Sequence, residues 1–196
     1  PHVLGNIYAT VRPNADFFFN MQTPYMAESD IHLPYAYDPL WHSPSRVPMR
    51  DRKHDAALIG LQYQQRTDLV QRLRTRGLNI FYELGIVYDD ARNIYHQTKC
   101  GLNWSSLRDT TARCFELMAM RTVPILNRVP DLVTLFKDGY DFIGFDTREE
   151  AVEQVAWYVD HPEHAEAMAD RARKAVEPHT WDTRMQAVLE MTGVLQ

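Results

Sequence analysis

The residues whose types and spacing best suit chemistry are Arg113 and Glu116, three positions apart in a segment with helical periodicity. Residues spaced in this way lie one turn apart on the same side of a helix. One interpretation is a modest surface ion pair, contributing about 0.2–0.5 kcal/mol. The other is that Glu116 accepts hydrogen bonds from a ribose diol, while Arg113 and the free amide groups of the helix N-terminus face a diphosphate. The spacing alone leaves both interpretations open.

Arg113 and Glu116 need a fold that holds them in position, and the pattern of residues from 51 onward predicts such a fold. Short apolar runs that end in glycine or in polar residues alternate with helical periodicity. The predicted strands span residues 54–60, 78–85, 99–104, 123–127 and 141–146. The predicted helices span residues 66–76, 89–97, about 112–121, 131–137, 148–160, 162–177 and 180–194. Alternating strands and helices imply an α/β fold, a Rossmann-like parallel sheet with helices on both faces.

Ligands of such sheets bind beyond the carboxyl ends of the strands, where helix N-termini present unpaired amide groups. Two loops are therefore candidates for the site. One runs from Gly60 to Arg66, after the first strand, and the other runs from Ser105 to Arg113, after the third. Hydroxyl groups in the second loop suit helix capping or phosphate contact better than a nucleophilic role, because no G-x-S-x-G motif is present.

Composition excludes several other classes of protein. The chain has 196 residues and a net charge of −5, so it carries no general nucleic-acid-binding footprint. It contains no G-x-G-x-x-G or Walker motif, no apolar run of membrane-spanning length and no convincing metal-ligand spacing. Cys100 and Cys114 lie in apolar segments, which favours a reduced, buried pair and a cytoplasmic location.

The first 46 residues differ from the rest of the chain. Residues 14–20 and 29–34 have a strand-like character, and the prolines that follow Pro34 favour an extended linker. We therefore expect two regions: a truncated N-terminal segment with linker over residues 1–46, and a domain with C-terminal helices over residues 47–196.

Several motifs in this order resemble the CgeB-like, spore-maturation type of group-1 glycosyltransferase. Residues 109–124 resemble the family core D-x-x-x-R-x-F-E-x-x-A-x-G, and residues 33–44 resemble its interdomain linker. Further similar stretches lie at residues 58–66, 95–103, 135–139 and 179–184. The resemblance implies the C-terminal, donor-binding domain of a GT-B fold. It also implies that the last helix crosses back toward residues 1–33, which would supply remnant strands and a helix.

The resemblance further implies a function, transfer of a sugar from a nucleotide-diphosphate sugar to an unknown acceptor, without a bound metal or cofactor. Glu116 would hold the ribose of the donor, and Arg113 and Arg66 would face its diphosphate. The remaining donor-site positions that the resemblance implies are Gly60, Lys99, Ser106, Asp109, Thr110 and Thr111. It assigns no catalytic residue.

Three departures from the family pattern keep an alternative open. Arg108 stands where related retaining enzymes carry a second glutamate, and Arg121 stands where the family has glycine. Only about 33 residues precede the linker, too few for an acceptor-binding domain. The chain is therefore a fragment, a short relative that uses a second copy or a partner subunit for the acceptor side, or a non-catalytic Rossmann-like binding or assembly module. An epimerase of the same fold is a weaker alternative.

Overall fold

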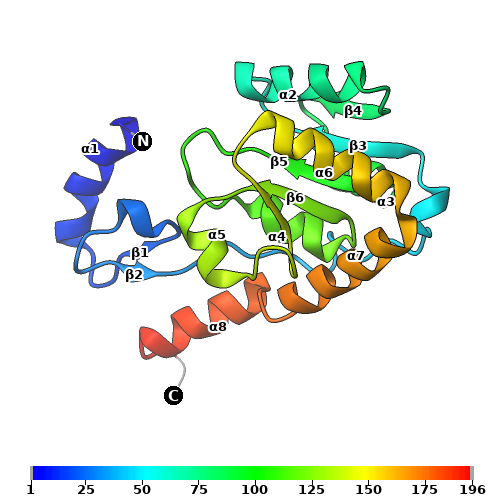
Figure 1. The fold of residues 1–196 in the computed structure, drawn as a ribbon. Coiled ribbons are helices and arrows are strands. Elements are labelled where there is room, and N and C mark those ends of the chain that lie inside the picture. The colour runs from blue at the N-terminus through cyan, green and yellow to red at the C-terminus, as the bar shows by residue number, and fades with distance from the viewer. Residues whose placement is uncertain (1, 195–196) are drawn as a thin grey trace.

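The computed structural model describes the backbone of residues 2–194 and the side chains of residues 7–194. At its centre is one parallel sheet with the strand order β4-β3-β5-β6-β7 (Figure 1). Its strands are β3 (His54–Ile59), β4 (Ile80–Glu83), β5 (Thr98–Asn103), β6 (Val123–Asn127) and β7 (Ile143–Phe145). All five coincide with predicted strands, which confirms the predicted fold class.

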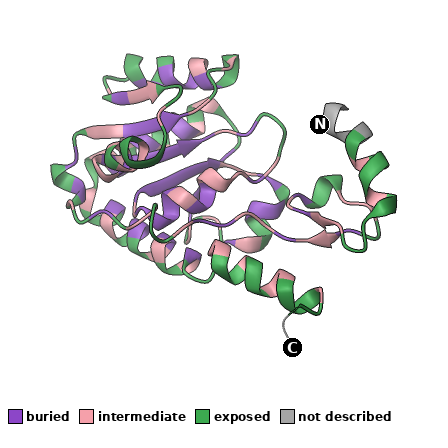
Figure 2. Ribbon diagram, turned by 180° about the vertical axis from the view of Figure 1, so that it is seen from behind, coloured by how far each residue is buried: buried purple, intermediate pink, exposed green. Residues whose placement is uncertain are grey.

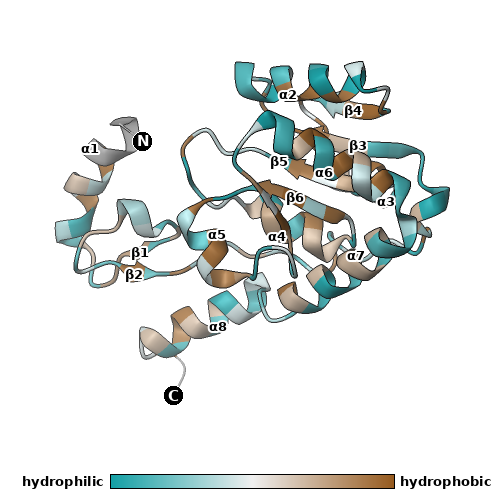
Figure 3. Ribbon diagram, in the orientation of Figure 1, coloured by the Kyte–Doolittle hydropathy of each residue, from teal (hydrophilic) through white to brown (hydrophobic). Residues whose placement is uncertain are grey.

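Helices follow the strands in the predicted alternation. They are α2 (Gln64–Thr75), α3 (Tyr88–His96), α4 (Ala112–Ala119), α5 (Pro130–Leu135), α6 (Arg148–Asp160), α7 (Pro162–Val176) and α8 (Trp181–Met191). Helices α2 and α6 pack on one face of the sheet through Leu69, Leu73, Ala151 and Val155. Helices α3 and α4 cover the other face. Strands β5, β6 and β7 are almost wholly buried, as a sheet covered on both sides requires, whereas the edge strand β4 is buried only at Ile80 (Figures 2 and 3).

The resemblance implies that the last helix crosses back toward residues 1–33, and the contacts at the start of this helix are with the linker that follows those residues. Tyr37 forms a parallel bridge with Thr180, and its backbone amide donates to the carbonyl of His179 at 3.1 Å. Nε of Arg184 donates to the carbonyl of Pro34 at 3.1 Å. These contacts hold the start of α8 against the extended chain that joins the N-terminal segment to the sheet.

The N-terminal segment forms a small layer of its own. It contains α1 (His2–Val11), a 3-10 turn (Arg12–Asn14), β1 (Phe19–Asn20), a second 3-10 turn (Thr23–Tyr25) and β2 (Ile31–His32). The two predicted strands are present but are only two residues long each. A third 3-10 turn (Met49–Asp51) leads into β3. In Figure 1 this segment lies beyond the end of the sheet at which β5 and β6 finish.

Cys100 and Cys114 are both free and buried, as predicted. Among residues 2–194 we find no helix with the length and apolar character that crossing a bilayer demands.

Candidate functional site

A crevice opens at the carboxyl ends of β3 and β5. The β3–β4 pairing continues to Ile59 and Glu83, whereas the last β3–β5 pair is Ala57 with Gly101. The two strands separate beyond that point, because the chain leaves β3 toward β4 on one side and returns to β5 on the other. The hydroxyl of the buried Tyr95 accepts a hydrogen bond from the backbone amide of Ile59 at 3.2 Å. Such a switch point is where parallel α/β sheets bind ligands.

Helix α4 begins at this crevice and presents one polar face to it. Its buried residues are Cys114, Phe115, Leu117, Met118 and Ala119. This apolar surface packs against the sheet, so Arg113 and Glu116 remain on the opposite, partly exposed side. The N-cap residue, Thr111, makes no side-chain capping bond. The first amide groups of α4 therefore have no side-chain cap, which leaves the helix N-terminus suited to an anion.

Arg113 and Glu116 form the ion pair that the spacing predicts, with Nε and Oε2 3.3 Å apart. Nη1 of Arg113 also donates to the Tyr95 hydroxyl at 3.2 Å. Burial opposes the charge of Arg113, but Tyr95 and Glu116 favour it, and its pKa lies above the usual arginine value. On the other side, Nε2 of His42 lies 3.7 Å from Oε1 of Glu116. Glu116 thus stands between two basic side chains and keeps 20% of its side chain exposed.

These side chains line a cavity of about 330 Å³, which we call the Glu116 pocket. The linker contributes Trp41 and His42, α4 contributes Arg113, Glu116 and Met120, and the segment from Ile86 to Arg92 closes the third side. The rings of Trp41 and Tyr88 lie 5.5 Å apart and are both exposed. The pocket therefore combines two aromatic rings with a carboxylate and two basic groups, within the size range of small-molecule sites.

Gly60 and Arg66 lie at the end of β3 and the start of α2. Gly60 has a φ of 137°, a conformation that favours glycine, and a Cβ atom there would lie 3.1 Å from Nη1 of Arg66. Arg66 is buried, and its guanidinium donates to the carbonyls of Leu61 and Trp104 and to Oδ1 of Asn103. Its hydrogen bonds thus fix the loops after β3 and β5, and two of its five N–H groups remain for another acceptor.

The four predicted site residues in the loop after β5 differ in their burial and in their hydrogen bonds. Ser106 is exposed, whereas Thr110 is buried and its hydroxyl has no hydrogen-bond partner among the described residues. Asp109 accepts a hydrogen bond from the Ser105 hydroxyl. Thr111 is the N-cap of α4. All four therefore lie at or near the helix N-terminus, at the same edge of the sheet as Gly60 and Arg66.

Lys99 is the one predicted site residue that the fold does not bring to this edge. It is the second residue of β5, and its Nζ lies 2.8 Å from Oδ1 of Asp55 near the start of β3. Both residues belong to the amino edge of the sheet. Because all strands run in parallel, that edge lies opposite the crevice, so Lys99 is separated from the other candidates.

Among residues 2–194, three residues other than glycine adopt left-handed backbone conformations: Tyr88, Arg108 and Arg121. Tyr88 lines the Glu116 pocket, and Arg108 lies in the loop that precedes α4. Arg121 occupies the position at which the resembled family has glycine, and its φ of 62° explains that preference. Its side chain pairs with Glu166 and Asp170, each at 2.5 Å. The turn into β6 is therefore made without glycine, at the cost of some backbone strain.

Sequence patterns did not assign His42, Trp41, Tyr88 or Tyr95 to the site. The linker similarity included His42, but no local pattern places it beside a residue of α4. The similarity of residues 95–103 begins at Tyr95, but it gives this residue no role in the site. Only packing shows that its hydroxyl joins β3 to Arg113.

Comparison of the fold with solved structures gives neighbours that include the following three, each of which is distant in sequence. The structure of Anabaena HepE, which holds UDP and glucose, has a TM-score of 0.75 and 9% identity and covers 100% of this chain and 68% of its own. Sucrose-phosphate synthase from Thermosynechococcus elongatus has a TM-score of 0.67 and 12% identity, covering 99% of this chain and 62% of its own. The pneumococcal O-GlcNAc transferase GtfA, solved with UDP and GlcNAc, has a TM-score of 0.66 and 13% identity, covering 95% and 46%. The chain thus spans between 46% and 68% of the length of these proteins.

At the sequence level, a comparison with curated proteins gives no match. A family model described as "Glycosyl transferase-like" does match, and it covers residues 46–190, which include every strand of the five-stranded sheet and every residue predicted for the donor site. The chain belongs to the glycosyl transferase-like family.

Proposed function

We propose that this chain binds a nucleotide-diphosphate sugar at the Glu116 pocket and takes part in transferring its sugar to an acceptor hydroxyl. The observation that carries this proposal is the setting of Glu116. It lies on the partly exposed face of α4, pairs with Arg113, has His42 on its other side, and lines a cavity that also contains two exposed aromatic rings.

The pocket suits a nucleoside. A carboxylate only accepts hydrogen bonds, so Glu116 matches a diol such as that of ribose, whose two hydroxyls donate. The rings of Trp41 and Tyr88 offer flat apolar surfaces for a base. The ion pair with Arg113 is then a positioning contact as well as a local stabilising one, because it holds the carboxylate at the mouth of the pocket.

The diphosphate belongs at the N-terminus of α4, less than two turns before Glu116. Breaking the bond between the anomeric carbon and the diphosphate leaves negative charge on the leaving group. The amide groups of the first turn and the cationic Arg113 are in place to stabilise that charge without a metal ion. Among the residues that the structure describes, no group of three or more His, Cys, Asp or Glu side chains is placed to hold one. Metal-independent transfer nevertheless stays a prediction, and so does the CgeB-like subgroup.

Thermal unfolding with nucleotides tests the proposal. We expect UDP or GDP to raise the Tm of the wild-type chain, and Glu116→Gln to weaken nucleotide binding by about 10- to 100-fold, since hydrogen bonds to a charged group are each worth about 1.5–3 kcal/mol. Glu163→Gln, an exposed glutamate at the start of α7, is the matched control and should leave the shift unchanged. If neither nucleotide at millimolar concentration changes the Tm, the proposal is wrong.

A second candidate is a non-catalytic binding or assembly module. Arg108, where retaining relatives carry a glutamate, favours it: the side chain is exposed on a loop with a left-handed backbone, and it offers no carboxylate to the site. Stabilisation by UDP without any release of UDP from UDP-sugars, with or without added acceptors, would favour this candidate. Dependence on a second copy or a partner subunit, and a cytoplasmic location, stay predictions.

A further inference from the structure

A buried tyrosine contacts the lining of the Glu116 pocket, and the proposed function does not use it. Tyr95 is the next-to-last residue of α3, and its side chain is buried in the core that α3 and α4 form with one face of the sheet. Its hydroxyl oxygen accepts two hydrogen bonds. The backbone amide of Ile59 donates one at 3.2 Å, and Nη1 of Arg113 donates the other at 3.2 Å. The phenol therefore connects the sheet to a cation that lines the pocket.

The first of these hydrogen bonds fixes the phenol to the sheet. Ile59 is the last residue of β3 and pairs with Glu83 of β4, but it lies two residues beyond the last β3–β5 pair, Ala57 with Gly101. Strand β5 thus offers no partner to the amide of Ile59, and a buried amide without a partner costs free energy. The Tyr95 hydroxyl supplies that partner. The position of its oxygen is therefore set by the end of a buried strand.

The second hydrogen bond holds one end of Arg113. Besides this bond, the guanidinium carbon lies 5.4 Å from the centroid of the Tyr95 ring, and Nε faces Oε2 of Glu116 at 3.3 Å. Nη2 of Arg113 donates a hydrogen bond to none of the residues that the structure describes, and 25% of the side chain is exposed. Contacts at Nη1 and at Nε fix the plane of the guanidinium and leave Nη2 for a ligand in the pocket.

Tyr95 orients Arg113 without opposing its charge. Burial raises the pKa of the Tyr95 phenol, so the hydroxyl stays neutral. Arg66, the other arginine that the resemblance places at the diphosphate, is likewise held by neutral acceptors, two backbone carbonyls and one amide oxygen. Arg121 and Arg128, which do not line the pocket, are instead held by carboxylates. Neutral anchors leave the positive charge available to an anion.

We propose that Tyr95 is a positioning residue of the donor site, which holds Arg113 where the guanidinium binds the diphosphate. The inference rests on the proposed function, in which Arg113 faces that group. Tyr95 has no exposed surface, so it acts through Arg113 and not by contact with the ligand. Without the hydroxyl, the guanidinium keeps Glu116 as its anchor and turns two N–H groups onto that carboxylate, away from the diphosphate. A carboxylate has about four acceptor positions, so Glu116 still binds the ribose.

NMR titration of the full chain with UDP and with uridine tests this, with GDP and guanosine in parallel. In Tyr95→Phe, which removes the hydroxyl and keeps the ring, the diphosphate should bind about tenfold more weakly and the nucleoside less than about twofold more weakly. The ratio of the two affinities is the readout, because a general loosening of the pocket weakens both ligands equally. An unchanged ratio would overturn the proposal.

Tyr37→Phe is the matched control. Tyr37 is also buried, its hydroxyl also accepts a hydrogen bond from Nη1 of an arginine, Arg173, at 3.2 Å, and that guanidinium carbon lies 5.7 Å from its ring centroid. Neither residue lines the Glu116 pocket. The ratio of diphosphate to nucleoside affinity should therefore stay at its wild-type value in this variant.

A double-mutant cycle with Arg113→Gln shows whether Tyr95 acts through Arg113. Tyr95→Phe should change the affinity ratio about tenfold in the wild-type background and less than about twofold in the Arg113→Gln background. Equal changes in the two backgrounds would contradict the proposal, because the hydroxyl would then act by another route.

A second measurement covers the case in which Tyr95→Phe does not fold. In nucleotide-free Glu116→Gln, Tyr95 is the remaining anchor of the Arg113 guanidinium. We expect ¹⁵N NMR of this variant to show separate signals for the two Nη groups of Arg113, since the bond to Tyr95 slows rotation about the Nε–Cζ bond. A single averaged signal would show that the phenol does not hold the guanidinium.

The outcomes separate this inference from the proposed function, because the nucleotide-induced change in Tm is measured on the same samples. If UDP or GDP binds and raises the Tm but Tyr95→Phe keeps the wild-type affinity ratio, the positioning role is wrong and the proposed function stands. If neither nucleotide binds the wild-type chain, the proposed function is wrong and the role of Tyr95 is overturned with it.

Discussion

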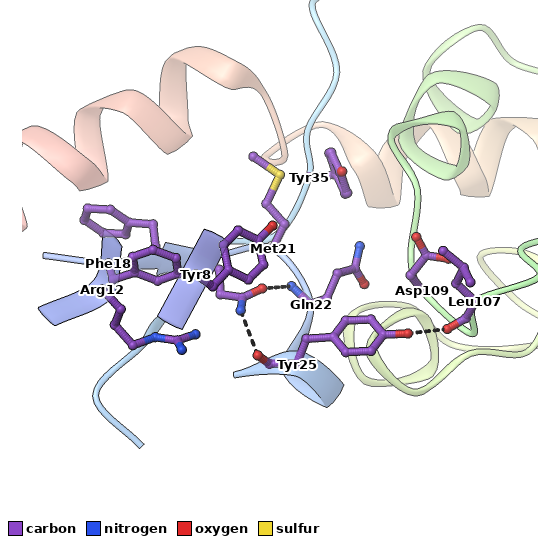
Figure 4. A pocket seen from close by; sticks show the side chains of 11 residues that line it. Tyr8, Arg12, Phe18, Met21, Gln22, Tyr25, Tyr35, Leu107 and Asp109 are labelled. Atoms are coloured by element: carbon purple, nitrogen blue, oxygen red, sulfur yellow. Dashed lines mark hydrogen bonds between the residues drawn. The ribbon is translucent and has the colours of Figure 1, made fainter. Parts of the chain in front are cut away.

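The side chain of Gln22 and the backbone of Thr110 form a closed pair of hydrogen bonds across 88 residues of sequence. Nε2 of Gln22 donates to the carbonyl of Thr110, and the amide of Thr110 donates to Oε1 of Gln22 at 2.9 Å. Both residues are buried. The amide side chain of Gln22 thus satisfies both backbone groups of Thr110, and it joins the N-terminal segment to the loop that precedes α4 (Figure 4).

Replacement of Gln22 tests how firmly this segment is held. Gln22→Ala leaves a buried amide and a buried carbonyl without partners, which costs about 1–3 kcal/mol. We expect the Thr110 amide to exchange its hydrogen about 10- to 100-fold faster in native-state exchange, a direct readout of local opening. Gln62→Ala, at an exposed position, is the control. Unchanged protection of Thr110 would mean that other contacts hold the loop.

Replacement of Lys99 tests whether this lysine belongs to the donor site. Because it pairs with Asp55 at the amino edge of the sheet, and both side chains are less than one-fifth exposed, Lys99→Gln should lower the free energy of unfolding by about 1–3 kcal/mol and leave the UDP-induced change in Tm intact. Arg113→Gln, at the crevice, should reduce that change in Tm. Urea unfolding and thermal shift measure the two effects separately. A loss of UDP binding in Lys99→Gln would show that the lysine has a role that its position does not suggest.

Two substitutions of Arg121 separate the effect of backbone strain on stability from the effect of losing its ion pairs. Arg121→Ala and Arg121→Gly both remove the contacts with Glu166 and Asp170, but only glycine adopts the left-handed conformation without strain. The glycine variant should therefore be more stable than the alanine variant by about 1–2 kcal/mol in urea unfolding. Equal stability of the two variants would contradict the inferred strain.

His179 should make the fold sensitive to acid. Burial, followed by the charge of Arg184, lowers the pKa of His179 to about 4, and its Nδ1 lies 2.6 Å from Nη2 of Arg184. Since the folded-state pKa lies below the unfolded value of 6.5, the unfolded chain binds the proton first as the pH falls. The stabilisation is therefore complete above pH 6.5 and is lost progressively toward pH 4.

Urea unfolding at pH 7.5 and pH 4.5 measures this effect. Because His179 is partly exposed, we expect the loss on acidification to be on the order of 1 kcal/mol larger in the wild type than in His179→Gln. His54 and His96, whose pKa values burial also lowers, act in the same direction in both proteins and cancel in the comparison. His164→Gln, at an exposed position, should behave like the wild type. An identical acid response of His179→Gln would exclude this histidine as the cause.

Local patterns were sufficient for the sheet and for part of the site. Apolar runs and helical periodicity located all five strands of the sheet, and the spacing of Arg113 and Glu116 predicted their contact. The sequence also held a signal about Lys99 that the motif comparison did not use. Lys99 opens its predicted strand, whereas ligands of a parallel sheet bind where strands end, so strand direction alone places it at the far edge.

The sequence by itself determined the class of fold, the order of its elements and the helix face that carries Glu116, because these depend on periodicity and on contacts within a few residues. Only the tertiary structure decided that His42 lies beside Glu116, that Tyr95 joins β3 to Arg113, and that the side chain of Gln22 pairs with the backbone of Thr110. Each of these contacts joins segments that are distant along the chain. Their formation depends on how whole elements pack, and no local pattern records it.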